Sequence, residues 1–485
     1  MKAKQFLFWL HRWLGIAMCL LFALWFASGV VMMYVEYPEL TEEERLGYLP
    51  LVDLDQVHLT PFEAASQSGS GALVTAIKLT TVLGRPAFEI MGVDRQVAMV
   101  FADSGEAVRE ISADLALIAA RGSGFAAVDS SVTYDALVDI DQWSITAVLN
   151  PHRPLHRIRM NDGQGSVVYI SSRTGQVVLD TSRDERFWNW LGSTIHWIYP
   201  LVLRKNAPLW TQVIVYASLL GIFSVITGGI IGFMRIRVSK RYRGEGFSPY
   251  RGWMKWHHLL GLFSLIFVST FIFSGLMSMG PWGIFNSATS PMPQLNRYYG
   301  NDSLRLFDLP MPQSGESSSL IKEVEWHQVQ GSSYYSYVSS PSRREAYFSG
   351  ASAGSSAVKL LAVVSAAIPD LLPDAELESM ELVSEEDNYY YSRHNNFRPF
   401  PVYRAKFDDA ESTWYHIDLN NGEIVNRVTD ANRLERWLFN GLHSLDFQFL
   451  IRNRPVWDVL MILLSIAGLI FSLTAVVIGW RRLLR

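Results

Sequence analysis

The chain has 485 residues, of which 49% are hydrophobic and 18% are charged, and its formal net charge at pH 7 is −4. This composition is more apolar than that of a typical soluble protein but too polar for a chain buried wholly in lipid, so it predicts a membrane protein with large extramembrane parts. The charge argues against a nucleic-acid partner. Cys19 is the only cysteine, which excludes intramolecular disulfides and cofactors held by several thiolates.

Four apolar runs without a charged residue predict four transmembrane helices. Each is close to or longer than the roughly 20 residues that a helix needs to cross a bilayer core. The runs are residues 14–35, 208–234, 259–280 and 459–480. The first is too long for a cleaved signal peptide and lacks a small-residue cleavage site, so we expect it to remain in the protein.

Lysine and arginine flank these runs mainly on one side. They precede the first run, fill the loop between the second and third, and follow the fourth, at Lys2, Lys4, Arg12, Arg235, Arg237, Lys240, Arg241, Arg243, Arg251, Lys255, Arg481, Arg482 and Arg485. Glutamates dominate the segment after the first run. Because cytoplasmic loops carry the excess of Lys and Arg, both termini and the short loop are predicted to be cytoplasmic.

The two long segments outside the membrane are predicted to be small α+β domains. In the first, β-rich runs separated by Gly and Asp turns and one helical pattern are expected at 72–81, 85–91, 96–101, 112–121 (helix), 155–160, 166–171 and 176–180. The second resembles it, with 334–339, 356–368 (helix), 402–407, 413–419 and 423–427. Short alternating runs bounded by turn residues are typical of strands.

Chain order then gives the expected boundaries. Transmembrane helices occupy 1–35 and 257–280, outer domains occupy 36–185 and 281–432, histidine-bearing interfacial segments with transmembrane helices occupy 186–234 and 433–485, and a cytoplasmic loop occupies 235–256. The interfacial segments carry His196 and His443 about a dozen residues before the apolar runs. The depth of these two histidines in the bilayer is therefore left open by the sequence.

The second half of the chain repeats the first. Aligning Gly175 with Gly422 gives an offset of 247 (422 − 175), which also places His196 on His443. A second match, at an offset of 246, places His11 on His257. Two repeats of the same topology, each entering and leaving on the cytoplasmic side, predict a pseudo-two-fold axis along the membrane normal. His11 is then expected to face His257 near the cytoplasmic surface, and His196 to face His443 near the outer surface.

Two facing imidazoles suit a haem iron. Two axial histidines complete a b-type haem, whereas zinc needs more protein ligands than two histidines, and the core of a helical bundle is a known place for cofactors. The alternatives are an ordinary interfacial role for each histidine and a helix-packing role for Gly15 and Gly261, which follow His11 and His257 by four residues. His258 is the competing ligand at the inner site.

Other polar residues are given weaker interpretations. The histidines of the outer domains, His58, His152, His156, His327 and His416, have no matching partner in the other half and are assigned to local structure. Arg157 and Arg404 do correspond. They would attract an anionic iron chelate or haem propionates, or would belong to a charge-paired β-surface.

The histidine motifs resemble those of the PepSY-associated transmembrane proteins, often labelled iron-regulated membrane proteins. The matching motifs are Leu10-His-Arg-Trp-Leu-Gly15, Gly192-Ser-Thr-Ile-His-Trp197, Trp256-His-His-Leu-Leu-Gly261 and Gly441-Leu-His443. The resemblance implies a bacterial inner-membrane protein with periplasmic PepSY-like domains. Some members are similar to di-haem ferric-siderophore reductases, which implies His11, His257, His196 and His443 as axial ligands of two haems.

The expected function is transmembrane electron transfer to a ferric chelate or siderophore. The donor is expected to be a separate cytoplasmic molecule or a quinol, because no flavin domain of the kind fused in some members follows Trp480. Outer-sphere reduction needs no general acid or base, so no catalytic residue is assigned. The rivals are a siderophore permease, which would want broken or polar mid-span helices, and a PepSY-type regulatory or peptidase-inhibiting membrane protein.

Overall fold

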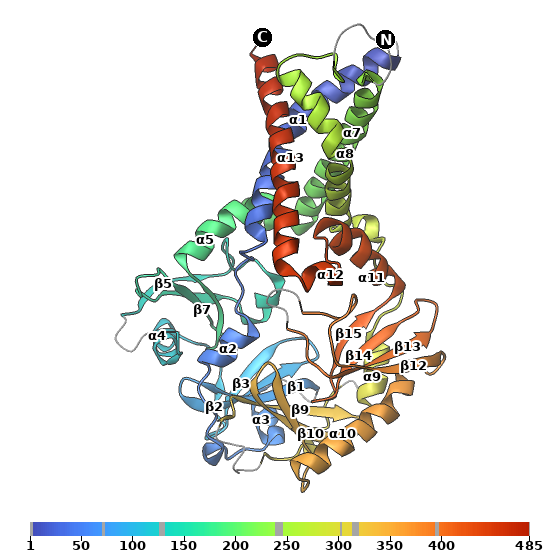
Figure 1. Cartoon of the computed structure of the whole chain (residues 1–485). Coiled ribbons are helices and arrows are strands. Elements are labelled where there is room, and N and C mark those ends of the chain that lie inside the picture. Colours follow the sequence, from blue (N-terminus) through green and yellow to red (C-terminus); the bar gives the residue numbers. More distant parts are fainter. Residues whose placement is uncertain are drawn as a thin grey trace. The chain divides into compact units, whose positions relative to one another are not determined.

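The computed structural model describes residues 3–69, 73–125, 131–237, 246–300, 303–312, 320–392 and 397–484. The chain forms two compact units (Figure 1). The helical unit comprises Met1–Tyr37, Glu185–Asn286 and Ala431–Arg485, and the sheet unit comprises Pro38–Asp184 and Ser287–Asp430. The predicted cytoplasmic cations Lys2, Lys240, Arg241, Arg243 and Arg485 lie outside the described residues.

Four long helices build the helical unit: α1 (Ala3–Met32), α7 (Ala207–Arg235), α8 (Trp253–Met277) and α13 (Arg454–Leu483). α1 packs against α7 and α13, and α8 packs against the same two helices. The predicted runs 208–234 and 459–480 lie within α7 and α13, whereas the runs 14–35 and 259–280 extend three residues beyond the ends of α1 at Met32 and α8 at Met277. α7 and α13 begin in the same way, with Asn206 or Asn453 at the N-cap and proline in the first turn, where the missing N–H of proline costs no helical hydrogen bond.

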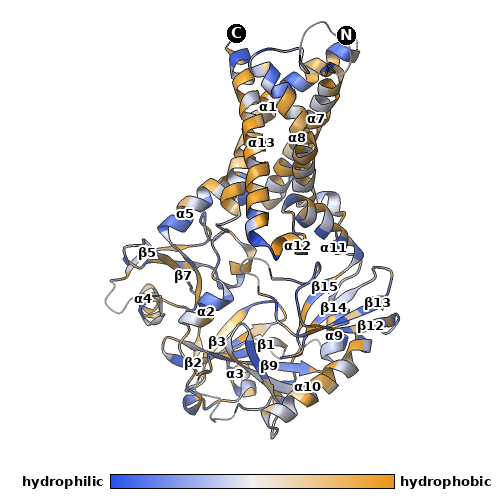
Figure 2. Ribbon diagram, in the orientation of Figure 1, coloured by the Kyte–Doolittle hydropathy of each residue, from blue (hydrophilic) through white to orange (hydrophobic). Residues whose placement is uncertain are grey.

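Shorter helical segments connect these helices. They are α5 (Arg183–Asn189), a π-helical turn at Trp190–Thr194, α6 (Leu201–Arg204), α11 (Asp430–Glu435), a π-helical turn at Arg436–Gly441 and α12 (Gln448–Ile451). Figure 2 shows that apolar residues cover the four long helices, and Phe263 and Ile266 of α8 are 76% and 82% exposed within the protein. Large apolar surfaces of this kind are suited to lipid rather than water.

Five described helices are long and apolar enough to cross a membrane, one more than the sequence predicts. The fifth is the segment Ala353–Leu371, which contains α10 (Ala353–Ala367) and lies in the sheet unit. There Leu360, Val364 and Ala367 are buried in a core formed with strand residues. Its apolar stripe is therefore buried in the core of the sheet unit.

The sheet unit contains three antiparallel sheets. The seven-stranded sheet has the order β11-β10-β9-β1-β2-β3-β4, and the two four-stranded sheets have the orders β5-β6-β7-β8 and β12-β13-β14-β15. The first-half strands are β1 (Val74–Val82), β2 (Arg85–Gly92), β3 (Val97–Phe101), β4 (Ala107–Val108), β5 (Thr133–Val138), β6 (Leu155–Arg159), β7 (Val167–Ser171) and β8 (Val177–Thr181). The second-half strands are β9 (Glu323–Val329), β10 (Ser332–Ser340), β11 (Arg343–Tyr347), β12 (Glu376–Val383), β13 (Val402–Asp408), β14 (Trp414–Asp418) and β15 (Ile424–Val428).

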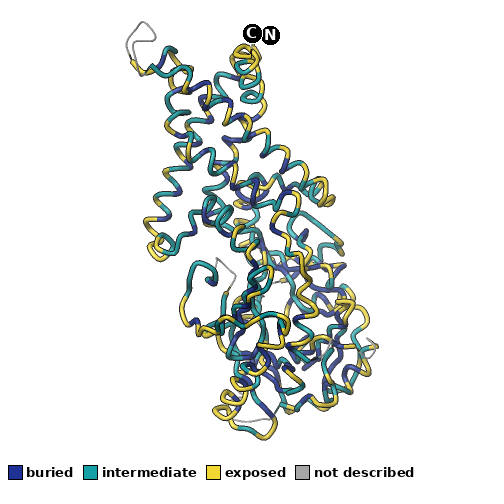
Figure 3. Tube along the Cα trace, turned by 90° about the vertical axis from the view of Figure 1, so that its right-hand side faces the viewer, coloured by how far each residue is buried: buried dark blue, intermediate teal, exposed yellow. Residues whose placement is uncertain are grey.

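Helices complete the sheet unit. They are α2 (Glu42–Tyr48), α3 (Pro61–Gln67), α4 (Ala113–Gly122), α9 (Met292–Tyr299) and α10, with single 3₁₀ turns at Leu54–Gln56, Ala147–His152, Leu306–Asp308 and Ile368–Leu371. α4 covers the β5–β8 sheet, and α10 packs with β13 and β14. Figure 3 shows the buried residues of these cores in dark blue.

The two outer regions expected from the sequence share the seven-stranded sheet. β1 of the first region pairs with β9 of the second, so that Lys78 lies opposite Glu325 and Leu79 opposite Val324. Val324 and Trp326 lie in one hydrophobic core with residues of β1 and β2. The regions 36–185 and 281–432 are therefore joined by backbone hydrogen bonds as well as by packing.

Candidate paired-histidine sites

His11 on α1 and His257 on α8 form the inner pair. Their ring centroids lie 6.4 Å apart with an interplanar angle of 31°. His11 Nδ1 lies 3.2 Å from Thr227 Oγ1 and 3.2 Å from the Ser224 carbonyl on α7. His257 Nδ1 lies 3.0 Å from Thr474 Oγ1 on α13. Each imidazole is therefore held by a hydroxyl of a neighbouring helix.

His196 and His443 form the outer pair, with ring centroids 6.1 Å apart and an interplanar angle of 71°. His196 Nδ1 lies 3.1 Å from Ser28 Oγ on α1 and 3.2 Å from the Trp25 carbonyl. His443 Nδ1 lies 3.0 Å from Ser274 Oγ on α8. The π-helical turns thus bring His196 to the side of α1 and His443 to the side of α8.

The contacts in the first half recur in the second at offsets of 246 or 247. Ser28 corresponds to Ser274 and Thr227 to Thr474, and each holds the equivalent histidine. The same holds for the backbone after the outer histidines, where two non-glycine residues have positive φ, Ile198 at 49° and Leu445 at 50°. A positive φ in β-branched Ile198 is strained, and its recurrence marks a turn that both halves require.

The spacing of the two pairs fits one metal between each pair. A metal–imidazole bond is about 2 Å, and the ring centroid lies roughly 1 Å beyond the nitrogen, so two axial imidazoles should have centroids about 6 Å apart. The distances of 6.4 and 6.1 Å agree with this. Since Nδ1 of each ring already has an oxygen partner, Nε2 is the nitrogen suited to a metal.

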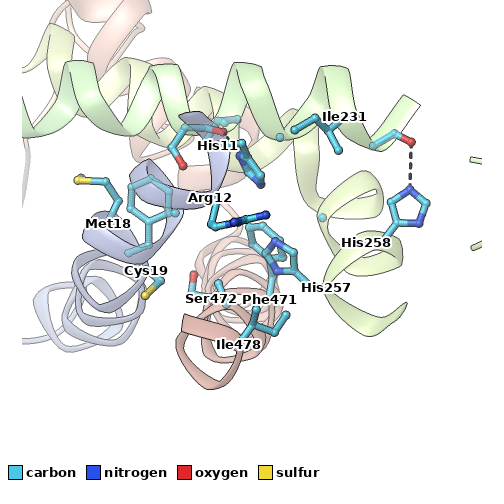
Figure 4. Close-up of a pocket in the computed structure, with 18 of the residues that line it drawn as sticks. His11, Arg12, Met18, Cys19, Ile231, His257, His258, Phe471, Ser472 and Ile478 are labelled. Atoms are coloured by element: carbon cyan, nitrogen blue, oxygen red, sulfur yellow. Dashed lines mark hydrogen bonds between the residues drawn. The ribbon is translucent and has the colours of Figure 1, made fainter. Parts of the chain in front are cut away.

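A cavity of about 390 Å³ adjoins the inner pair (Figure 4). Its lining includes both histidines and the glycines Gly15, Gly228, Gly229, Gly232 and Gly261. A Cβ at Gly15 would have no atom within 4 Å, so the wall there is open space. The volume lies within the roughly 300–1,000 Å³ of small-molecule sites, and the apolar glycine-rich wall with two imidazoles suits a planar haem.

His258, the competing inner ligand, has a different role. Its Nδ1 lies 2.9 Å from Ser248 Oγ and its Nε2 lies 3.0 Å from the Gly232 carbonyl. Figure 4 shows this ring directed away from His11, toward the end of α7. Both nitrogens of His258 already have hydrogen-bond partners, which leaves His257 as the residue that faces His11.

Arg157 and Arg404 lie in ion pairs within their own sheets. Arg157 Nε is 2.6 Å from Asp135 and its Nη1 is 2.9 Å from Asp141. Arg404 is buried, lies 2.6 Å from Asp387 and donates from Nε to His416 Nε2. Burial alone would raise the pKa of Asp387, but the hydrogen bond from Arg404 lowers it. Both arginines therefore make the contacts expected of a charge-paired β-surface, which is the alternative to attracting an anionic chelate.

The hydroxyl residues that orient the histidines were not predicted as site residues. Ser28 and Ser274 stand in the Phe-Ala-Ser-Gly and Ile-Phe-Ser-Gly matches, and Thr227 and Thr474 differ by the same 247 that relates His196 to His443. Polar residues at equal offsets within apolar runs are therefore the signal that identifies them.

A family model described as the PepSY-associated TM region matches residues 8–482. Among curated proteins no sequence matches the chain. The family match confirms the resemblance predicted from the histidine motifs, and it includes all four long helices and all four paired histidines.

Proposed function

Because the chain belongs to the family of PepSY-associated transmembrane proteins, we propose that it is a di-haem electron-transfer protein that reduces a ferric chelate. The observation that carries this proposal is the pair of facing imidazoles at each of two sites, with centroids 6.4 and 6.1 Å apart. A ferric siderophore is the proposed acceptor, and a quinol or a cytoplasmic carrier is the proposed donor.

The proposed topology has four spans, α1, α7, α8 and α13, in a bacterial inner membrane. α10 is not counted, since its apolar face is buried in the extramembrane core. Arg235, Arg251, Lys255 and Arg481 stand at one end of the spans, which favours that end as cytoplasmic. Both chain termini lie at a single end of the helical unit (Figure 1). The sheet unit is then periplasmic.

His11 and His257 would hold the inner haem, and His196 and His443 the outer one. A bound b-type haem supplies a one-electron redox couple. Ser28, Ser274, Thr227 and Thr474 fix the orientation of the imidazoles through Nδ1. Removing an outer-shell contact of this kind typically changes metal affinity by about 10–100-fold.

Aromatic side chains occupy the space between the two sites. His11 and Ser28 are separated on α1 by about 25 Å at a rise of roughly 1.5 Å per residue. Phe471 stacks on His257 with centroids 5.1 Å apart, and Phe271 lies 5.9 Å from His443 and 6.2 Å from Phe26. These residues exclude water from the bundle core and keep the medium between the sites apolar.

The test is the absorption spectrum of the full chain purified in detergent after haem-sufficient expression. The expected spectrum has Soret and α bands, with two haems per chain, and the reduced bands should be reoxidised by a ferric siderophore. A preparation without these bands would exclude the di-haem proposal. A haem-containing protein whose reduced bands persist with ferric chelates would retain electron transfer but require another acceptor.

Gly15→Leu is expected to remove about half of the haem. The added side chain would extend into the cavity beside His11, where a Cβ meets no protein atom within 4 Å. The leucine side chain would therefore compete for space with a bound haem and not with protein atoms. Haem per chain and melting temperature should be measured together, with Gly47→Leu, a glycine also without neighbours within 4 Å, as the control. If the haem content is unchanged and the melting temperature rises, the cavity is a packing gap and not a haem site.

Gly228→Ala is expected to weaken the inner site, whereas Gly29→Ala should leave the outer site intact. A Cβ at position 228 would lie 2.7 Å from His11 Cε1, but at position 29 it would lie 3.4 Å from His196 Cε1. The methyl group at position 228 must displace the His11 imidazole, which Thr227 holds in place. Haem content and the reduced-minus-oxidised spectrum of the two variants measure the difference, and equal behaviour would show that His11 is free to move.

A further inference from the structure

Three potential metal ligands meet in the sheet unit. Glu325 and His327 are two residues apart on β9 and therefore point to the same face of the strand, and Glu423 lies in the turn before β15. One ligand atom from each lies within 4.8 Å of the other two. His327 Nδ1 is 3.5 Å from Glu423 Oε1. This spacing is wide for direct hydrogen bonds but close enough for one ion to contact all three.

His327 is buried with one ring nitrogen facing Glu423 and the other unpartnered. Its side chain is 8% exposed and stacks on Tyr334 with ring centroids 5.4 Å apart. The Nε2 atom has no hydrogen-bond partner. An unsatisfied buried polar group costs about 1–3 kcal/mol, so packing alone does not account for this imidazole, whose Nδ1 faces a carboxylate.

The surroundings carry excess negative charge. Glu323 is paired with Arg45 and Lys78, Glu89 with Lys78, and Glu325 with Arg344. Arg344 and Arg45 also share Glu42. Of the described residues in this network, five carboxylates including Glu423 therefore meet three cationic side chains.

The equivalent position in the first half lacks the carboxylate. Gln176 stands where Glu423 stands in the second half (423 − 176 = 247). Its amide Nε2 donates a hydrogen bond of 2.6 Å to Glu89 Oε2. The turn of the first half folds with an amide at this position. The fold therefore does not require the Glu423 carboxylate beside Glu325.

We propose that Glu325, His327 and Glu423 bind a divalent first-row transition-metal ion. One imidazole nitrogen with carboxylate oxygens is a donor set suited to Zn²⁺, Fe²⁺ or Mn²⁺, whereas Ca²⁺ and Mg²⁺ prefer oxygen alone. Glu423 is 43% exposed, which gives the ion a route from solvent and leaves positions for water. The site uses none of the paired histidines and does not depend on haem.

Zn²⁺ binding to the full chain tests the proposal. After treatment with EDTA, equilibrium dialysis of the haem-loaded protein should show one Zn²⁺ that Glu423→Gln weakens by about 10–100-fold. Glutamine is the residue of the first half at this turn, so the variant should fold. Glu376→Gln, on the exposed part of β12, is the matched control and should bind as the unchanged protein does.

Three results separate the outcomes. Added Zn²⁺ should raise the melting temperature of the unchanged protein and of Glu376→Gln, but not of Glu423→Gln or His327→Gln. Wild-type affinity in both ligand variants, or no saturable Zn²⁺ in the unchanged protein, would overturn the site. The Soret band is recorded in the same samples, so loss of haem is scored separately from loss of Zn²⁺.

Discussion

The His443→Ala variant should retain one haem of two. His443 faces His196 at a centroid distance of 6.1 Å and is held by Ser274, so its removal leaves the outer site with a single imidazole. The inner pair uses α1 and α8 residues far from this position and should still fill. We expect the Soret absorbance per chain to fall by about half, and a fall of this size reflects loss of one axial bond of several kcal/mol at a site that has no substitute ligand.

Matched variants identify which histidines matter. His11→Ala should remove the other haem, and the double variant His11→Ala/His443→Ala should contain none. His258→Ala tests the competing inner ligand and should retain both haems, since its nitrogens contact Ser248 and Gly232. His58 is an exposed residue of the sheet unit, so His58→Gln is the control for haem lost during purification. Full haem in His443→Ala, or loss in His258→Ala, would require a different assignment of ligands.

Glu323→Ala should destabilise the sheet unit more than any other single removal of a carboxylate there. Both Glu323 oxygens accept from Arg45 at 2.7 Å, Lys78 lies 3.4 Å away, and the Glu323 side chain is 0% exposed. Its loss leaves two partly buried cations, Arg45 and Lys78, without their shared partner. Breaking a buried ion pair costs about 3–5 kcal/mol, to be measured by urea unfolding of the full chain monitored by tryptophan fluorescence, with Glu376→Ala as the exposed control.

The same group makes stability depend on pH. Burial would raise the pKa of Glu323, but Lys78 and Arg45 outweigh it and hold the value at about 2. A carboxyl with a depressed pKa stabilises the fold above its unfolded value, near 4.3, and loses that contribution as pH falls toward 2. Glu323→Ala should therefore flatten the decline in unfolding free energy between about pH 5 and pH 2. An equal decline in the variant would mean that other carboxyls govern acid unfolding.

The long helices and the pairing of histidines follow from local sequence. An apolar run of about 20 residues specifies a helix by composition alone, and the offsets of 246 and 247 relate His11 to His257 and His196 to His443. Facing pairs then follow from symmetry. The count of apolar helices does not follow so simply, because α10 satisfies the same composition rule while packing in the core of the sheet unit.

Other parts of the fold depend on contacts that no local pattern contains. The π-helical turns before His196 and His443 end at Thr194 and Gly441, and the chain then turns at Ile198 and Leu445, residues that would not ordinarily be assigned positive φ. The β1–β9 pairing joins strands about 250 residues apart, and strand order is set by which faces can be buried together. The Glu325–His327–Glu423 cluster was missed for the same reason, since its third member comes from a distant turn.

β1 and β9 are each the first strand of their half, and they meet as antiparallel neighbours in the middle of the seven-stranded sheet. Cutting the chain between α7 and α8 and separating the halves would turn both into open edges, which are sites for pairing with another chain. Antiparallel pairing of equivalent strands is what a two-fold axis produces. A half-length chain of this type would therefore close its sheet, and complete each two-histidine site, only by associating with a second copy.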